Sequence, residues 1–303
     1  MPRFSPLCFR ALLLLAAGIG AAGCAIAPPA RVPAGRVVEF QIPAPSLGAA
    51  RRSVLVYLPP SYARTGRARL YPVIYFLHGG PGWNGDWFRH GGLRELLDAL
   101  IAQRRVPELI GIAPDGRGPG RDGRSLWINN WNGSARIEDF LVHDVVAWAD
   151  STLRTRADET DRALVGVSDG GGAALSLLMH HPDEFGECAG LSGRYHPHGP
   201  HGLEPVIGTS PRRDSVLAAC SPALYASRVA ARLAGHTIYF DAGVLDFDAR
   251  DVALLDSRLA QLGVRHDARL YFGWHDWPWW RRRLVVCLPE IARGFEPQRG
   301  RSL

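Results

Sequence analysis

Short apolar runs alternate along the chain with longer amphipathic segments. The runs are rich in β-branched and aromatic residues, which is typical of buried strands. Between most of them, apolar residues recur every three or four positions, which predicts helices with one buried face. Strands are expected at Val54–Leu58, Val73–Leu77, Leu109–Ala113, Ala163–Val167, Cys188–Leu191, Thr237–Asp241 and Ala268–Phe272. Helices are expected at Leu93–Gln103, Ile137–Leu153, Ala173–His181, Val252–Leu262 and about Trp279–Ile291.

Strands that alternate with helices predict an α/β fold with a mainly parallel central sheet and helices on both of its faces. The 303 residues show no internal repeat and no mid-chain linker, so we expect one domain over residues 36–303. The Pro- and Ala-rich residues 24–35 predict a tether before it, and the Gly-, Pro- and His-rich segment Arg194–Ser221 predicts an excursion over one edge of the sheet. Functional side chains are expected at the carboxyl ends of the strands.

An export signal is predicted at the N-terminus, over residues 1–23. Arg3 and Arg10 precede an apolar run that is too short to span a membrane. The small residues before Cys24 resemble the cleavage site of bacterial lipoproteins, in which the Cys becomes the lipidated first residue, although Ala21 stands where Leu is usual. The alternative is ordinary cleavage nearby, with Cys24 unmodified. Either way we expect an exported protein, in the periplasm or anchored to the outer membrane by its lipid alone.

Every one of the 35 basic residues is an arginine, which excludes a Schiff-base lysine, a P-loop lysine and a Ser-x-x-Lys catalytic pair. The formal net charge is +6, and it falls to +4 when residues 1–23, with Arg3 and Arg10 and no acidic residue, are removed. The arginines are scattered and no nucleic-acid motif is present. We therefore expect solvated arginines and no nucleic-acid partner.

No metal or cofactor motif is recognisable, and none is expected to be needed. Beyond Cys24 the mature chain keeps Cys188, Cys220 and Cys287 without a C-x-x-C pair, so one disulfide is allowed but its pairing is open. Three histidines form the pattern H-x-H-x-x-H: His196, His198 and His201. In a loop rich in Gly and Pro, this pattern favours a solvated or lid role over a metal site.

A nucleophile motif follows one predicted strand. Gly166-Val167-Ser168-Asp169-Gly170 matches the pattern G-x-S-x-G. The pattern alone is weak, but here it stands between a strand and a helix, as the chemistry requires. The tight turn lifts the serine hydroxyl above the sheet, and the glycines relieve crowding at a strained backbone. Ser168 is therefore the candidate nucleophile.

A serine hydroxyl needs a base to take its proton and an acid to orient that base, in the chain order Ser, Asp or Glu, His. Asp246 follows the strand Thr237–Asp241, and His275 follows the last strand. Both loops follow the carboxyl ends of parallel strands, so we expect Ser168, Asp246 and His275 to meet at that end of the sheet. Asp241 is the alternative acid, and a structural role at the strand end is expected for it instead.

An oxyanion needs preorganised backbone donors, one after the nucleophile and one after an early strand. We assign them to the N–H groups of Asp169 and Gly80, because Leu77-His78-Gly79-Gly80-Pro81-Gly82 follows such a strand and Pro81 has no N–H. His78 could act as a base, but a structural hydrogen bond is the preferred interpretation.

Several segments in order resemble the esterase D, feruloyl esterase and antigen 85 group of α/β-hydrolases, over nearly the whole mature chain. They are Val56–Tyr62, Tyr71–Gly80, Glu138–Val142, the nucleophile motif, His181–Phe185 and the two loops of Asp246 and His275. The resemblance implies Ser168 as nucleophile, Asp246 as orienting acid and His275 as base. The group commonly has Met or another neutral residue at the position of Asp169. A carboxylate there would either oppose the developing negative charge or point into solvent.

These features predict a serine carboxylic-ester hydrolase that forms an acyl-enzyme on a small, aryl-bearing or sugar-bearing ester. The alternatives are an acyltransferase with the same triad and a non-catalytic ligand-binding member of the fold, and a peptidase is less favoured. Aromatic residues near the predicted active face suggest the walls of a cleft, although some could cap the core instead. The candidate substrate-binding residues are Trp83, Trp87, Trp131, Trp274 and Trp277. The oligomeric state is not predicted.

Overall fold

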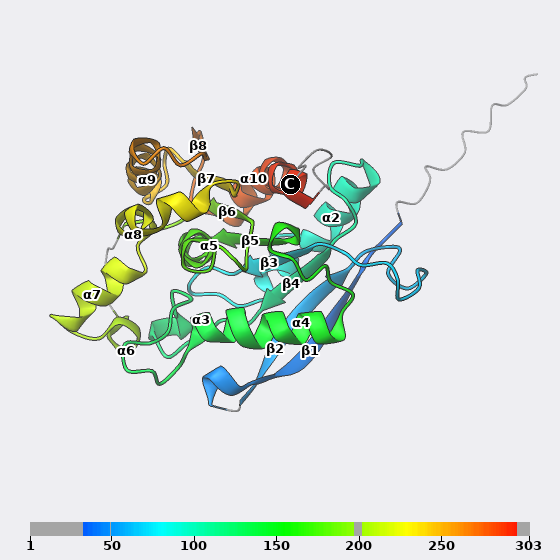
Figure 1. Cartoon of the computed structure of the whole chain (residues 1–303), viewed down its shortest axis with the longest axis horizontal. Coiled ribbons are helices and arrows are strands. Elements are labelled where there is room, and N and C mark those ends of the chain that lie inside the picture. Colours follow the sequence, from blue (N-terminus) through cyan, green and yellow to red (C-terminus); the bar gives the residue numbers. More distant parts are fainter. Residues whose placement is uncertain (1–32, 49, 197–201, 296–303) are drawn as a thin grey trace, which may run out of the picture. The chain divides into compact units, whose positions relative to one another are not determined.

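An eight-stranded sheet forms the centre of the computed structural model, which describes residues 33–48, 50–196 and 202–295 (Figure 1). The strand order is β1-β2-β4-β3-β5-β6-β7-β8. The strands are β1 Arg36–Ala44, β2 Ala50–Leu58, β3 Val73–Leu77, β4 Ile110–Pro114, β5 Arg162–Val167, β6 Glu187–Leu191, β7 Thr237–Gly243 and β8 Asp267–Tyr271. The export signal, Cys24, most of the tether, His198 and His201 lie outside the described residues.

The sheet is mainly parallel, as the alternation of strands and helices predicts. β2 pairs antiparallel with both β1 and β4, and all the other neighbours are parallel. All the predicted strands are present to within a few residues at their ends. β1 is an addition, because the first predicted strand begins at Val54. As an edge strand, β1 pairs only with β2 and keeps much of its surface exposed, so it lacks a continuous apolar run.

Helices cover both faces of the sheet (Figure 1). The α-helices are α1 Asp86–Arg89, α2 Leu93–Ala102, α3 Ile137–Asp139, α4 Val146–Thr152, α5 Asp169–His180, α6 Glu204–Ile207, α7 Arg212–Ala219, α8 Pro222–Val229, α9 Ala249–Gln261 and α10 Trp277–Ala292. Side chains alternate along β3: Val73, Tyr75 and Leu77 join a core with α4, α5, α8 and α9. Ile74 and Phe76 join a second core with α2 and α10. Because successive side chains of a strand point to opposite faces of the sheet, β3 contributes to both cores.

Two predicted helices differ in detail from the observed ones. The segment predicted as Ile137–Leu153 is helical to Thr152, with a π-helical turn over Phe140–Val145. α5 begins at Asp169, four residues before the predicted start at Ala173. The prediction starts late because the first turn contains three glycines, which are poor helix formers. Close packing explains them, since a Cβ on Gly170 would lie 2.2 Å from the Leu77 carbonyl oxygen.

The end of the predicted tether belongs to the folded domain. Gly35 is buried, and its N–H donates a 2.7 Å hydrogen bond to the Asp98 carboxylate. A Cβ at this position would lie 2.4 Å from the Tyr57 ring. The tether boundary predicted at residue 35 is therefore too late.

The excursion Arg194–Ser221 contains α6 and α7. Its Leu203, Val206 and Leu217 pack in a small separate cluster with Ile128, which lies in the loop after β4. The excursion therefore covers this loop at the carboxyl end of the sheet. Among the described helices, none has both the length and the apolar character needed to cross a bilayer. Cys188, Cys220 and Cys287 are free thiols.

Candidate active site

Ser168 lies at the sharp turn between β5 and α5. Its backbone has φ 55° and ψ −123°, a strained conformation that costs about 1–3 kcal/mol and persists only where the surroundings enforce it. A Cβ on Gly166 would lie 1.9 Å from the Gly170 carbonyl oxygen, so only glycine fits beside the turn. The Ser168 N–H donates to the Leu191 carbonyl oxygen at 2.9 Å, which anchors the turn on β6.

The structure brings the three predicted side chains into one hydrogen-bonded chain. His275 Nε2 lies 2.9 Å from Ser168 Oγ, and His275 Nδ1 lies 2.9 and 3.0 Å from the two carboxylate oxygens of Asp246. The three residues follow β5, β7 and β8, so separate strand ends supply them. These distances suit a serine hydroxyl that donates to Nε2 and an Nδ1–H that donates to the carboxylate.

The Asp246 carboxylate is buried but kept in its charged form. It accepts hydrogen bonds from His275, from the side chain of Ser192 and from the backbone N–H of Asp248. Burial raises the pKa of Asp246, but these hydrogen bonds outweigh it and hold the pKa below its ordinary value. An ionised carboxylate at this place can orient the imidazole and stabilise an imidazolium.

Asp241, the alternative acid, has other partners. Its Oδ2 accepts hydrogen bonds from the Arg283 guanidinium, at 2.8 Å, and from the Tyr239 hydroxyl. Burial raises the pKa of Asp241 to about 6, although both partners lower it. No hydrogen bond in the described residues joins Asp241 to His275. The geometry therefore favours Asp246 as the partner of His275.

The ring of His275 is fixed by two aromatic neighbours. Phe247 lies at 4.1 Å between ring centroids, and Trp280 lies edge-on at 5.1 Å. The Trp280 indole N–H donates to Ser192 Oγ at 2.8 Å, and Ser192 in turn bonds Asp246. The aromatic packing and the hydrogen bonds thus fix the His275 imidazole and the Asp246 carboxylate relative to each other.

The loop after β3 lies against the nucleophile. A Cβ on Gly79 would lie 2.9 Å from Ser168 Cβ, and Gly80 lines the same cavity as Ser168. Asp169 is the first residue of α5, whose opening N–H groups lack helical partners and carry the positive end of the helix dipole. Negative charge that develops at this place would be stabilised. The N–H groups of Gly80 and Asp169 remain the predicted donors.

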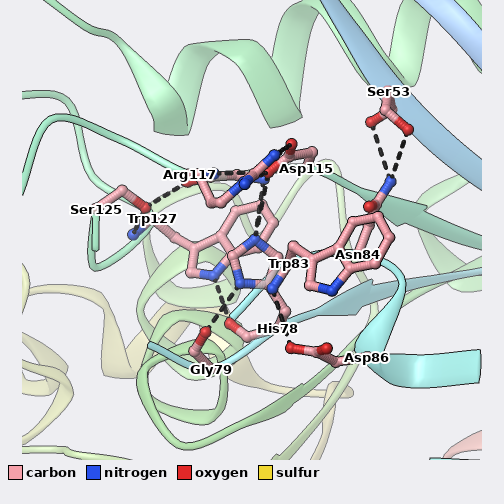
Figure 2. A network of polar contacts seen from close by, with 11 residues as sticks. Ser53, His78, Gly79, Trp83, Asn84, Asp86, Asp115, Arg117, Ser125 and Trp127 are labelled. Carbon is pink, nitrogen blue, oxygen red and sulfur yellow. Dashed lines mark hydrogen bonds and ion pairs between the residues drawn. The ribbon is translucent and has the colours of Figure 1, made fainter. Parts of the chain in front are cut away.

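His78 is the first residue of this loop, and Figure 2 shows its ring between Gly79 and Asp115. Its Nδ1 lies 2.9 Å from the Gly79 carbonyl oxygen, and its Nε2 accepts a 3.1 Å hydrogen bond from the Gly116 N–H. The Trp127 indole donates to the His78 carbonyl oxygen at 3.0 Å. Burial lowers the pKa of His78. Because the backbone engages both ring nitrogens, His78 is a neutral structural residue, as the preferred interpretation of the sequence has it.

Asp169 neither faces solvent nor stands unopposed beside the nucleophile. Its carboxylate, only 4% exposed, lies 3.0 Å from Arg124 Nε and 3.8 Å from Arg194 Nη1. The solvent-facing alternative for this residue is therefore wrong, because the carboxylate is buried and arginines from two distant segments meet it. Its opposition to a developing negative charge stays a prediction. The sequence did not predict either ion pair. Arg124 and Arg194 lie 45 and 25 residues from Asp169, and no local pattern connects them to it.

An open cavity of ≈ 430 Å³ adjoins Ser168 and His275, and Trp277 lines it, as predicted. Trp87 does not: its side chain is fully buried and packs on Phe76 and Trp277, with ring centroids 5.1 and 5.4 Å away. The prediction of substrate contact is wrong for Trp87, which is a core residue. The other three predicted tryptophans are exposed but do not line this cavity: Trp83, Trp131 and Trp274. Trp280 lines it in addition.

Two clusters of groups that can bind metal ions occur among the described residues. One is Asp246, Asp248 and His275. In this cluster the Asp246 carboxylate already bonds His275 Nδ1 and the Asp248 N–H. In the other, one oxygen of Glu138 lies 3.0 Å from His180 Nδ1 and 2.8 Å from His181 Nε2. The second nitrogen of His180 faces the Ala219 carbonyl oxygen at 3.0 Å. Burial lowers the pKa of His180, but Glu138 outweighs it and raises the pKa, so an imidazolium accounts for these contacts.

The sheet, the strained serine turn and the hydrogen-bonded triad geometry define an α/β-hydrolase fold. A solved ferulic acid esterase is similar, with a TM-score of 0.77 and 25% identity over 86% of this chain and 99% of that chain. MPT51 of Mycobacterium tuberculosis shares the fold, with a TM-score of 0.67 and 16% identity over 86% of this chain and 98% of that one. The predicted fold class is confirmed.

The chain belongs to the esterase family, whose model, "Putative esterase", matches residues 46–291. An endo-1,4-beta-xylanase/feruloyl esterase of Xylanibacter ruminicola is 29% identical over 140 residues, which are 46% of this chain and 19% of that protein. An esterase of Mycobacterium tuberculosis is 31% identical over 146 residues, 46% of this chain and 28% of that protein. The chain covers less than a third of the length of both curated relatives. The predicted resemblance to the feruloyl esterase and antigen 85 group is confirmed.

Proposed function

We propose that this protein is a serine carboxylic-ester hydrolase. The observation that carries the proposal is the hydrogen-bonded chain from Ser168 through His275 to Asp246 at the carboxyl edge of the sheet. Membership of the esterase family and the likeness to a ferulic acid esterase support it. No step of this reaction calls for a metal ion or an organic cofactor.

The geometry supports acyl transfer in two steps. Ser168 Oγ attacks the ester carbonyl carbon while its proton passes to His275 Nε2, and Asp246 stabilises the imidazolium that forms. The carbonyl oxygen becomes an oxyanion beside the N–H groups of Gly80 and Asp169. The C–O bond then breaks, the alcohol leaves with the proton from His275, and an acyl-enzyme remains. Water, deprotonated by His275, attacks the acyl-enzyme and releases the acid and Ser168.

The substrate is proposed to be a small ester or one that carries an aryl or sugar group. A cavity of ≈ 430 Å³ is within the range of ligand sites, and Trp277 and Trp280 give it aromatic walls. An acyltransferase would use the same triad and replace the water with an alcohol. Turnover of an aryl ester with and without added sugar acceptors distinguishes the two, because a transferase forms a new ester product.

Fluorophosphonate labelling of the purified mature protein tests the proposal, because the probe reports an activated serine without knowledge of the substrate. We expect labelling at Ser168 by peptide mapping, and none in Ser168→Ala. The matched control is Ser176→Ala, at a buried serine of the helix α5 that follows Ser168. If the folded wild-type protein is not labelled, the hydrolase proposal is wrong and a binding function takes its place.

Export and a lipid anchor are part of the proposal, and they rest on residues 1–24 alone. Mass spectrometry of the exported protein is expected to show a diacylated Cys24 as the first residue. A different mature N-terminus would contradict the anchor, while the proposed chemistry would be unaffected.

A further inference from the structure

One guanidinium contacts both segments that are proposed to form the oxyanion hole. Arg124 Nη2 donates to the Gly80 carbonyl oxygen at 3.2 Å, which fixes the peptide that follows this residue. Its Nε donates to Asp169 Oδ2 at 3.0 Å, and Nη2 lies 3.4 Å from Asp169 Oδ1. Gly80 follows β3 and Asp169 follows β5, so Arg124 joins two loops that are distant in the sequence.

We propose that Arg124 is a positioning residue for the oxyanion hole: it holds Gly80 and Asp169 together and keeps the Asp169 charge away from the developing oxyanion. The inference rests on the proposed hydrolase function and assigns a role to a residue outside the triad. Its fork of donors suits the task, because a guanidinium can bond a carboxylate and a carbonyl group in fixed directions.

The space around Gly80 shows how closely these groups fit. A Cβ built on Gly80 would lie 2.3 Å from Asp169 Oδ2 and 2.8 Å from Arg124 Nε. The ion pair therefore packs directly on the glycine that supplies a proposed donor. Any movement of the guanidinium changes the contact with this glycine.

Burial makes the pairing necessary. The side chain of Asp169 is 4% exposed and that of Arg124 is 20% exposed, so water screens the carboxylate weakly. Arg194 lies farther from Asp169, at 3.8 Å, and also faces Asp248 at 3.5 Å, so it is shared between two carboxylates. Without Arg124, a poorly compensated negative charge would stand one residue after the nucleophile, where the oxyanion also forms.

This arrangement explains why a carboxylate is compatible with an active site that needs to stabilise negative charge. A neutral residue at this position would avoid the problem, whereas a buried Asp169 requires a cationic partner. Arg124 and Asp169 should therefore behave as a unit: removal of the arginine alone is more harmful than removal of both charges.

The test compares Arg124→Met, Asp169→Asn and the double variant on a short-chain aryl ester. We expect kcat of Arg124→Met to fall about 10- to 100-fold with KM within about threefold, because the change affects the transition state more than ground-state binding. The double variant should recover about fivefold or more of that loss, since it no longer holds an unpaired carboxylate. Arg121→Met is the matched control, an exposed arginine of the same loop, and it should keep wild-type kcat.

A second readout separates this role from a general loss of structure. An aryl trifluoromethyl ketone forms a tetrahedral adduct with an activated serine, and its inhibition constant should rise in parallel with the loss of kcat/KM in Arg124→Met. Recovery in the double variant should lower it again. If Arg124→Met does not fold, Arg124→Lys tests the positioning role alone, since lysine keeps the charge but lacks the fork. We expect kcat of Arg124→Lys to fall with KM nearly unchanged, and wild-type kcat in this variant would contradict the positioning role.

Wild-type kcat in Arg124→Met would overturn the inference. A fall in kcat that the double variant does not relieve would also overturn it. The same holds for a fall in kcat that leaves the inhibition constant of the ketone unchanged. Failure of the proposed function is distinguishable, because the wild-type protein would then show neither fluorophosphonate labelling nor ester turnover.

Discussion

The hydrogen bonds of a single imidazole define the tautomer that the proposed proton transfer needs. His275 Nδ1 faces the Asp246 carboxylate, which leaves Nε2 as the acceptor for the Ser168 hydroxyl. An amide at position 246 could present its N–H to Nδ1 and favour the tautomer with its proton on Nε2. That tautomer cannot accept the serine proton.

Asp246→Asn should therefore lower kcat for a short-chain aryl ester by about 10³- to 10⁴-fold while the protein stays folded. Asp241→Asn is the control, because Asp241 bonds Arg283 and Tyr239 instead of His275. We expect it to lower the Tm but to keep kcat per folded molecule within about fivefold. Steady-state kinetics with circular dichroism checks both variants, and the reverse pattern would show that Asp241 is the orienting acid.

At the scale of elements, the glycines of the serine turn fix how closely α5 approaches β3 and β5. Gly166 and Gly170 contact each other, and Gly170 also contacts the backbone of Leu77. A larger residue would push the start of α5 away from the sheet and move Ser168 relative to His275. Stability and activity therefore depend on the same close contacts.

Gly170→Ala should reduce the free energy of unfolding by about 2–4 kcal/mol and also lower ester turnover, because its Cβ would meet the backbone of Leu77. Gly66→Ala is the matched control, since a Cβ there has no neighbour within 4 Å. Urea unfolding monitored by fluorescence measures both variants. Equal stability of the two would mean that α5 can shift without cost, which contradicts the packing argument.

At the scale of the whole domain, another buried carboxyl group lies at the amino end of β6, whereas Ser168, Asp246 and His275 follow the carboxyl ends of their strands. Glu187 is 4% exposed and contacts Gly294 in the short helix after α10, and its Oε2 has no hydrogen-bond partner in the described part of the chain. Burial, together with Asp161 and Glu159, raises the pKa of Glu187 to about 9 from 4.5. The folded protein therefore holds this carboxyl neutral at pH 7.

A raised carboxyl pKa stabilises the fold fully below the unfolded value near 4.5, and this contribution is lost as pH rises toward 9. Glu187→Gln removes the titration, so its stability relative to wild type should increase by about 4 kcal/mol between pH 5 and 8.5. Glu204→Gln, at an exposed glutamate on α6, is the control. Thermal unfolding across this range measures the effect, and a pH-independent difference would contradict the neutral state of Glu187.

Much of the fold follows from local patterns. Val73–Leu77 was predicted as a strand and is one in the structure. All five of its residues are buried, so the segment is apolar throughout and is recognisable in the sequence. The meeting of Ser168, Asp246 and His275 was also predictable, because residues just after parallel strands share one edge of the sheet. The edge strand β1 was missed because its more buried side chains, such as Ile42 and Ala44, alternate with exposed ones and form no continuous apolar run.

The sequence by itself determined the α/β order of elements, the serine turn after β5 and the candidates for the proposed triad, because each depends on neighbours along the chain. Only the tertiary structure decided that Arg124 meets Asp169, that Trp87 is in the core while Trp277 lines the cavity, and that the backbone engages both nitrogens of His78. These outcomes depend on side chains that are far apart in the sequence and that packing alone brings together.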